Sequence, residues 1–96
     1  MRITVKLGEP LWRKVGQRRL ELELPGEQAS AAQALAALAA RYPGIRDEVL
    51  PDGSSAQERL PYHLFVNHHK IPWGQAGQVM LRDGDQLVLF LIVVGG

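Results

Sequence analysis

The chain has 96 residues and a net charge of +1, with 46% apolar and 22% charged side chains. These values predict one globular domain with a modest core, and they exclude a two-domain organisation and a deep internal pocket. The near balance of charge excludes a nucleic-acid or membrane-binding footprint over the whole surface. Because cysteine is absent, disulfides, thiolate metal sites and a cysteine nucleophile are excluded as well.

No segment has the pattern that directs a chain to a membrane. A strand pattern follows Met1 directly, without the charged, apolar and small-residue order of a signal peptide. The longest apolar run, Leu87 to Val94, has eight residues, less than half of what a membrane-spanning helix needs. We therefore expect a cytoplasmic protein with no membrane partner.

Two alternating segments open the chain. Residues 2–7, RITVKL, place Ile3, Val5 and Leu7 on one face, and residues 18–24, RRLELEL, do the same with their leucines. Both patterns predict half-buried strands. We expect residues 8–16 to form a loose hairpin connection in which Trp12 folds over the sheet edge. Four basic side chains lie close together in this part of the sequence and are interpreted as a solvated turn; they are Arg13, Lys14, Arg18 and Arg19.

The segment SAAQALAALAARYPG predicts a helix. Ser30 followed by Gln33 is the capping-box arrangement, in which each side chain satisfies the other's backbone amide. Apolar residues recur at helical spacing and predict the buried stripe, which consists of Ala31, Ala34, Leu35, Leu38 and Tyr42. Pro43 and Gly44 end the helix.

The second half of the chain predicts shorter elements. A turn of helix is expected at IRDEVL, followed by a polar loop. Residues 62–67 predict a third strand, residues 68–71 a turn into an edge strand, and residues 75–82 a connection. The turn at Asp83 to Asp85 then leads into the final strand.

This order predicts an α+β fold with a mixed sheet of four to five strands and one main crossover helix. A continuous apolar run indicates that the last strand is central, parallel to the first and covered on both faces. The right-handed crossover rule places the helix across one face of the sheet. The arrangement resembles the ubiquitin-like β-grasp fold, in a single domain over residues 1–96 with a C-terminal tail of about residues 91–96 protruding from it.

Conventional catalytic groups are few. Ser54 and Ser55 have no base nearby in the sequence, so neither is expected to be a nucleophile. His63, His68 and His69 could suggest a metal site, but adjacent histidines point to opposite faces of an extended chain. We interpret them as polar residues at a strand end and predict no bound metal. Asp83 and Asp85 are interpreted as turn residues whose oxygens accept hydrogen bonds from backbone amides.

The C-terminus is the remaining candidate. The carboxylate of Gly96 becomes an electrophile once an adenylyl group is transferred to it from ATP, and sulfur or an amine can then attack it. Two glycines make a thin end that can enter another protein's active site. The apolar side chains of residues 92–94 give a partner a surface to hold while the backbone adds hydrogen bonds.

Several segments together resemble the sulfur-carrier family that includes the small subunit of molybdopterin synthase and the thiamine-pathway sulfur carrier (MoaD/ThiS-like). They are Ser30 to Arg46, FVN at Phe65 to Asn67, LRDGDQLVLF from Leu81 to Phe90, and the final Gly95-Gly96. The resemblance covers nearly the whole chain. Two features depart from the family pattern: His68 stands where the family usually has glycine, and LIVV before the glycines is bulky.

The resemblance implies a carrier or co-substrate, or the non-catalytic small subunit of a sulfurtransferase, without a bound cofactor. Gly96 would be adenylated by an E1-like activating enzyme that consumes ATP, and then converted to a thiocarboxylate for molybdopterin biosynthesis. Gly95 would keep the tail slim. The partners would be that enzyme and a large catalytic subunit or other acceptor enzyme, with no direct nucleic-acid contact. The residues expected to meet these partners are Phe90, Leu91, Ile92, Val93 and Val94.

Other functions remain open from the sequence. The same activated terminus could form an isopeptide with lysines of other proteins, which would make the chain a ubiquitin-like modifier. A sulfur carrier could also serve thiamine, tRNA thiolation or amino-acid biosynthesis. Finally, the chain could be a binding module that uses its sheet face, with the two glycines playing no part.

Overall fold

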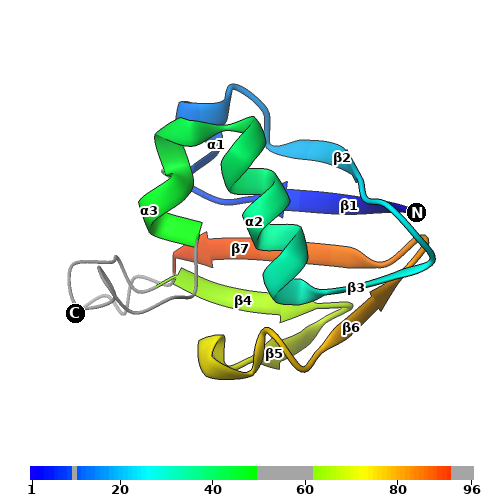
Figure 1. Cartoon of the computed structure of the whole chain (residues 1–96). Coiled ribbons are helices and arrows are strands. Elements are labelled where there is room, and N and C mark those ends of the chain that lie inside the picture. Colours follow the sequence, from blue (N-terminus) through cyan, green and yellow to red (C-terminus); the bar gives the residue numbers. More distant parts are fainter. Residues whose placement is uncertain (10, 50–61, 92–96) are drawn as a thin grey trace.

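The computed structural model describes residues 1–9, 11–49 and 62–91. The strands are β1 (Arg2–Leu7), β2 (Arg19–Glu23), β3 (Gln28–Ser30), β4 (Tyr62–Val66), β5 (His69–Ile71), β6 (Met80–Arg82) and β7 (Gln86–Leu91) (Figure 1). The helices are α1 (Leu11–Val15), α2 (Ala31–Arg41) and α3 (Arg46–Val49), with 3₁₀ turns η1 (Pro43–Ile45) and η3 (Trp73–Gln75). In these described ranges no helix is long and apolar enough to cross a membrane.

The main sheet has five strands in the order β2-β1-β7-β4-β5. β7 lies in its centre, parallel to β1 and antiparallel to β4, while β1 and β2 form an antiparallel hairpin. The predicted β-grasp arrangement, with the last strand central and parallel to the first, is confirmed. A strand in this position has hydrogen-bonded neighbours on both sides, so its path is strongly constrained.

A second sheet was not predicted. β3 pairs antiparallel with β6, and Ala29 lies opposite Leu81. The interpretation of residues 75–82 as only a connection is therefore wrong for residues 80–82. Each of these strands has three residues, too few to show the alternation from which a strand is recognised in a sequence.

The capping box of α2 forms as predicted. The amide of Gln33 donates to Ser30 Oγ at 3.0 Å, and the Ser30 amide donates to Gln33 Oε1 at 2.7 Å. Each bond satisfies a backbone donor that the first helical turn leaves without an intrahelical partner. The predicted stripe is buried except for Tyr42, which is half-buried at the helix C-cap, and it gains Ala39.

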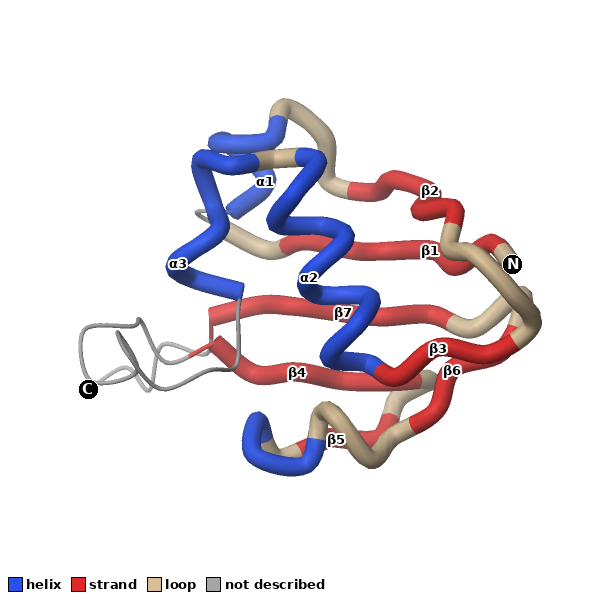
Figure 2. Tube along the Cα trace, viewed as in Figure 1, coloured by secondary structure: helices blue, strands red, loops and turns tan. Residues whose placement is uncertain are grey.

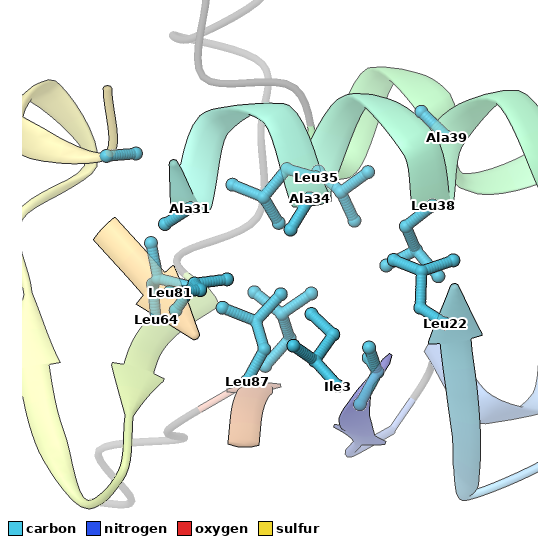
Figure 3. Close-up of a cluster of buried hydrophobic side chains, with 14 of the residues drawn as sticks. Ile3, Leu22, Ala31, Ala34, Leu35, Leu38, Ala39, Leu64, Leu81 and Leu87 are labelled. Atoms are coloured by element: carbon cyan, nitrogen blue, oxygen red, sulfur yellow. The ribbon is translucent and has the colours of Figure 1, made fainter. Parts of the chain in front are cut away.

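The core lies between α2 and one face of the main sheet (Figure 2). Leu35 points toward Ile3 and Leu87, and Leu38 points toward Leu22 (Figure 3). The alanines of α2 let the helix axis approach the sheet closely, because they add no bulk between the two layers. The alternating residues of β1 and β2 are inward, as predicted.

The expectation that β7 is covered on both faces is wrong. Leu87 and Leu89 are completely buried beneath α2, whereas Val88 and Phe90 on the opposite face are only half-buried. The continuous apolar run therefore combines a core-facing pair with an apolar pair on the opposite face. We call this the open face, because no helix of the described residues packs over it (Figure 2). Periodicity alone does not separate these two situations, because both produce an unbroken run of apolar residues.

The β1–β2 connection also differs from the loose hairpin that was expected. It contains the short helix α1, whose Leu11 is completely buried and whose Trp12 is half-buried. α1 contacts η1, so tertiary packing supports a helix of five residues that would not be stable alone.

We predict that Leu89→Ala lowers the free energy of unfolding by about 2–5 kcal/mol, because it leaves a cavity beneath α2. Val88→Ala, one residue earlier on the open face, should cost less than half as much, since Val88 is already partly hydrated. Denaturant midpoints of the two variants check the difference. Equal losses would contradict the assignment of the two faces of β7.

Candidate functional site

The candidate site is the C-terminal segment of the chain, which follows β7 directly. Phe90 and Leu91 are the last two residues of β7, and Leu91 pairs with Tyr62 of β4. Ile92, Val93, Val94, Gly95 and Gly96 lie outside the described residues. The roles assigned to these five residues from the sequence therefore stay predictions. The described structure shows how β7, the strand that precedes them, is held in place.

The start of β7 is held by Asn67 and Asp85. The Asn67 side chain donates to Asp85 Oδ1 at 3.0 Å and accepts from the Gln86 amide at 2.9 Å. The Asn67 amide also donates to the Gln86 carbonyl at 3.0 Å. One asparagine thus joins the end of β4 to the beginning of β7, and fixes the register between these two strands.

The turn before β7 uses its carboxylates as the sequence predicted. Asp85 Oδ2 accepts from the Arg82 amide at 2.8 Å, and Asp83 Oδ1 accepts from the Arg2 amide at 2.7 Å. Gly84 between them has φ +89°, a conformation that glycine adopts without steric cost. The turn therefore connects β6 and β7 to the beginning of β1.

The far end of β7 is packed closely against β1 and β4. The Gly8 amide donates to the Leu89 carbonyl at 2.7 Å. The Phe90 ring stacks on Phe65 of β4, with centroids 5.1 Å apart and planes 4° from parallel. Neither contact was predicted from the sequence. Phe65 alternates with the buried Leu64 and Val66, and this alternation could have indicated that Phe65 lies on the face opposite the core. Together they orient the strand where it leads into residues 92–96.

Next to Phe90, a shallow hollow is lined by Leu7, Gly8, Glu9, Trp12 and Arg18. The Arg18 guanidinium lies over the Trp12 ring, 4.5 Å from its centroid. Glu9 Oε1 accepts from Arg13 Nη2 at 2.9 Å and from Trp12 Nε1 at 3.3 Å. The hydrogen bond from Arg13, with its charge, lowers the pKa of Glu9. Trp12 and these charges form one connected surface beside the end of β7.

The three histidines do not come together. His63 lies opposite Phe90 on β4, whereas His68 and His69 lie beyond the other end of that strand, where His69 Nδ1 is 3.1 Å from the Asn67 carbonyl. The described residues contain no group of three or more histidine, aspartate or glutamate side chains that could hold a metal ion.

The ThiS family model matches residues 5–96. Small archaeal modifier protein 1 (SAMP1) from Haloferax volcanii is 25% identical, with 100% of both chains covered and a TM-score of 0.76. CysO from Mycobacterium tuberculosis is 22% identical with a TM-score of 0.69, over 95% of this chain and 99% of CysO. No curated protein sequence matches the chain.

A third similar structure is the protein–protein complex of subunits 1 and 2 of the molybdopterin-converting factor from Helicobacter pylori. The matched chain is 21% identical, with 100% of both chains covered and a TM-score of 0.58. At this identity, the similarity to it and to CysO concerns the fold alone.

The helix packed across a mixed sheet, with the last strand in its centre, defines a small protein of the ubiquitin-like β-grasp fold. The match over residues 5–96 shows that the chain belongs to the ThiS family of ubiquitin-like sulfur carriers.

We predict that His68→Gly raises the free energy of unfolding by about 1 kcal/mol, because His68 has φ +73°, which disfavours a side chain. Asn67→Gly is the matched control, since Asn67 also has a positive φ, +49°. It should be destabilising, because the bonds to Asp85 and Gln86 are lost. Thermal unfolding measures both, and stabilisation by Asn67→Gly would contradict the role given to its side chain.

Gly8→Ala should destabilise the fold by about 1–3 kcal/mol through overpacking. A Cβ at Gly8 would lie 2.5 Å from Phe90 Cβ and 3.1 Å from Phe90 Cα, so β1 and β7 would have to separate. At Gly44 a Cβ meets nothing within 4 Å, and Gly44→Ala should change stability by less than about 0.5 kcal/mol. Urea unfolding of both variants is the measurement; a neutral Gly8→Ala would show that the strands are not in close contact there.

Proposed function

We propose that this protein is a sulfur carrier whose terminal Gly96 is adenylated by an activating enzyme and converted to a thiocarboxylate. The observation that carries the proposal is the position of β7. The strand is central, buried on one face and bonded on both sides up to Leu89 and Leu91, and it leads directly into the last five residues, IVVGG. The family match extends through Gly96.

The rigid support of β7 is what such a carrier needs. A carboxylate that must enter another protein's active site is best carried on a short segment whose base does not move, because ordering a longer one would cost conformational entropy. The Asn67–Asp85 bonds hold the start of β7, and the Phe65–Phe90 stack holds its end. The chain itself supplies no catalytic group to the proposed reaction.

The proposed chemistry has two steps. A Gly96 carboxylate oxygen attacks the α-phosphorus of ATP in the activating enzyme, and pyrophosphate leaves. Sulfide delivered by a sulfur donor then attacks the acyl carbon, and AMP leaves with its former bridging oxygen. The product is a thiocarboxylate in which one oxygen of Gly96 has been replaced by sulfur.

For the acceptor, we propose a molybdopterin precursor bound to a large catalytic subunit. The Helicobacter pylori protein of similar fold forms a complex between subunits 1 and 2 of molybdopterin-converting factor, which supports this choice of partner. In such a complex Phe90, Leu91 and the apolar residues 92–94 would be held by the large subunit, while Gly95 and Gly96 reach its active site.

A second function is favoured by a separate observation. The Haloferax volcanii structure with a TM-score of 0.76 is a small archaeal modifier protein. The adenylated Gly96 could be attacked by a lysine amine in place of sulfide, which would release AMP and form an isopeptide bond. Tagged protein recovered from cells as larger, thiol-resistant conjugates, absent after deletion of Gly96, would establish this modifier function.

The carrier function is tested by the intact mass of the full chain after incubation with ATP, the adenylating enzyme of its source organism and a sulfide donor. We expect the mass to rise by the difference between one sulfur and one oxygen atom. Without ATP, or with Gly96 deleted, the mass should stay constant. Deletion should also leave the denaturant midpoint nearly unchanged, so loss of the reaction cannot be attributed to unfolding. An unchanged mass for the intact chain would refute the proposal.

A further inference from the structure

The strand β2 forms one edge of the main sheet, and no strand of the described residues lies on its outer side (Figure 1). On its inner side, the Leu24 amide donates to the Met1 carbonyl and the Leu7 amide to the Arg18 carbonyl, both at 2.8 Å. Backbone groups of successive residues point to alternate sides of a strand, so the even-numbered residues of β2 bond to β1. The residues whose backbone groups face outward are Arg19, Glu21 and Glu23.

Each of these three residues presents one amide donor and one carbonyl acceptor at the edge. Among the described residues, one of these groups has a hydrogen-bond partner: Arg41 Nη1 donates to the Glu21 carbonyl at 3.1 Å. Arg41 is an exposed residue in the last turn of α2, and it covers only part of the edge. A row of unpaired backbone groups can pair with a strand from another chain.

The exposed side chains of β2 are arranged with a cation at its start and carboxylates at its centre and end. Glu21 and Glu23 form salt bridges with Arg2 of β1. Arg19 belongs to none of the salt bridges among the described residues, and it lies directly opposite Lys6. Like charges in that position destabilise a sheet, so Arg19 lacks the carboxylate that would offset the repulsion.

We propose that β2 pairs antiparallel with β2 of a second copy of this chain, about a two-fold axis at Glu21, and that the two main sheets become one. Arg19 of each copy then lies opposite Glu23 of the other, and their outward amides and carbonyls exchange hydrogen bonds. The same strand thus supplies both members of each pair, as a two-fold interface requires. Glu23 of the second copy also offsets the repulsion between Lys6 and Arg19.

The charges and the length of β2 favour this register over its neighbours. Pairing about Glu21 aligns all five residues of the strand. It places two Glu21 carboxylates opposite one another, and Arg2, whose Nη1 is 3.5 Å from Glu21 Oε2, offsets their repulsion within each copy. A shift that pairs Arg19 with Glu21 leaves Glu23 beyond the end of the partner strand. A shift in the other direction pairs Glu21 with Glu23 and sets like charges opposite one another.

The dimer leaves the C-terminal strand accessible. β1 lies between β2 and β7, so β7 is not at the interface, and the two-fold axis turns the β7 strands of the two copies in opposite directions. The inference therefore goes beyond the proposed function and does not depend on it. Because the contact consists mainly of one strand edge, we expect weak association, with a Kd on the order of 100 µM.

The test is sedimentation equilibrium of the full chain at concentrations up to about 1 mM, roughly ten times the expected Kd. Arg19→Glu and Glu23→Arg should each weaken self-association about tenfold or more, because both ends of the interface then carry like charges. An equimolar mixture of these two variants should dimerise again, since opposite charges then meet at both ends. Arg82→Glu is the matched control: it reverses one exposed charge on β6, outside the edge, and should associate as the intact chain does.

Two measurements separate pairing from folding. Arg19→Glu should not lower the denaturant midpoint at concentrations where the chain is monomeric, because Lys6 then lies opposite a carboxylate. Arg41→Ala should strengthen association about threefold, because it removes the donor that competes for the Glu21 carbonyl.

The inference is overturned if the intact chain stays monomeric at about 1 mM, if either charge variant associates as strongly as Arg82→Glu, if their mixture does not dimerise, or if Arg41→Ala weakens association. A monomeric chain that still gains sulfur on Gly96 would refute the dimer alone. A charge-dependent dimer without any mass increase would refute the carrier chemistry and leave the dimer established.

Discussion

The parallel pairing of β1 with β7 is the constraint on which the rest of this structure depends. It joins the first strand of the chain to the last, so the sheet cannot be completed until β7 is inserted between β1 and β4. Parallel strands need a long crossover, and α2 lies within that crossover and covers the face that the pairing creates. The direction of β7 follows from the same pairing, because two parallel strands finish at the same end of a sheet.

The register of β7 matters as much as its direction. Side chains alternate between faces, so a slip of one residue would move Leu87 and Leu89 from the core to the open face. Three side chains oppose such a slip, because each accepts a hydrogen bond from one particular backbone amide. Asn67 accepts from Gln86 at the start of β7, Asp83 from Arg2 at the start of β1, and Asp85 from Arg82 at the end of β6. Asp83 and Asp85, interpreted from the sequence as turn residues, thus position the strand together with Asn67.

The two faces of the main sheet have different physical roles. The face beneath α2 carries buried apolar side chains of the core, and it supplies the stability of the domain. The open face combines half-buried apolar side chains with charges of both signs. They include the like-charged pair of Lys6 and Arg19 across β1 and β2, and the salt bridges of Arg2 with Glu21 and Glu23. A small domain can tolerate the repulsion because the charges remain hydrated and the energy of each exposed pair is small.

The sequence by itself determined the parts of the fold that are encoded locally. Several elements can be predicted from a few adjacent residues. They are the strands with alternation in residues 2–7 and 18–24, the helix start with the capping box at Ser30 and Gln33, and the turn before Leu87. The terminal glycines and their resemblance to sulfur carriers identified the candidate site. The sequence did not reveal the β3–β6 sheet, helix α1, the Phe65–Phe90 stack or the open face of β7. Each of these depends on which distant residues become neighbours. Segments of three to five residues are also too short to show a periodicity from which a strand or helix could be predicted. Only the tertiary structure decided which face of the last strand α2 covers, because burial is a property of the packed layers and not of the apolar run itself.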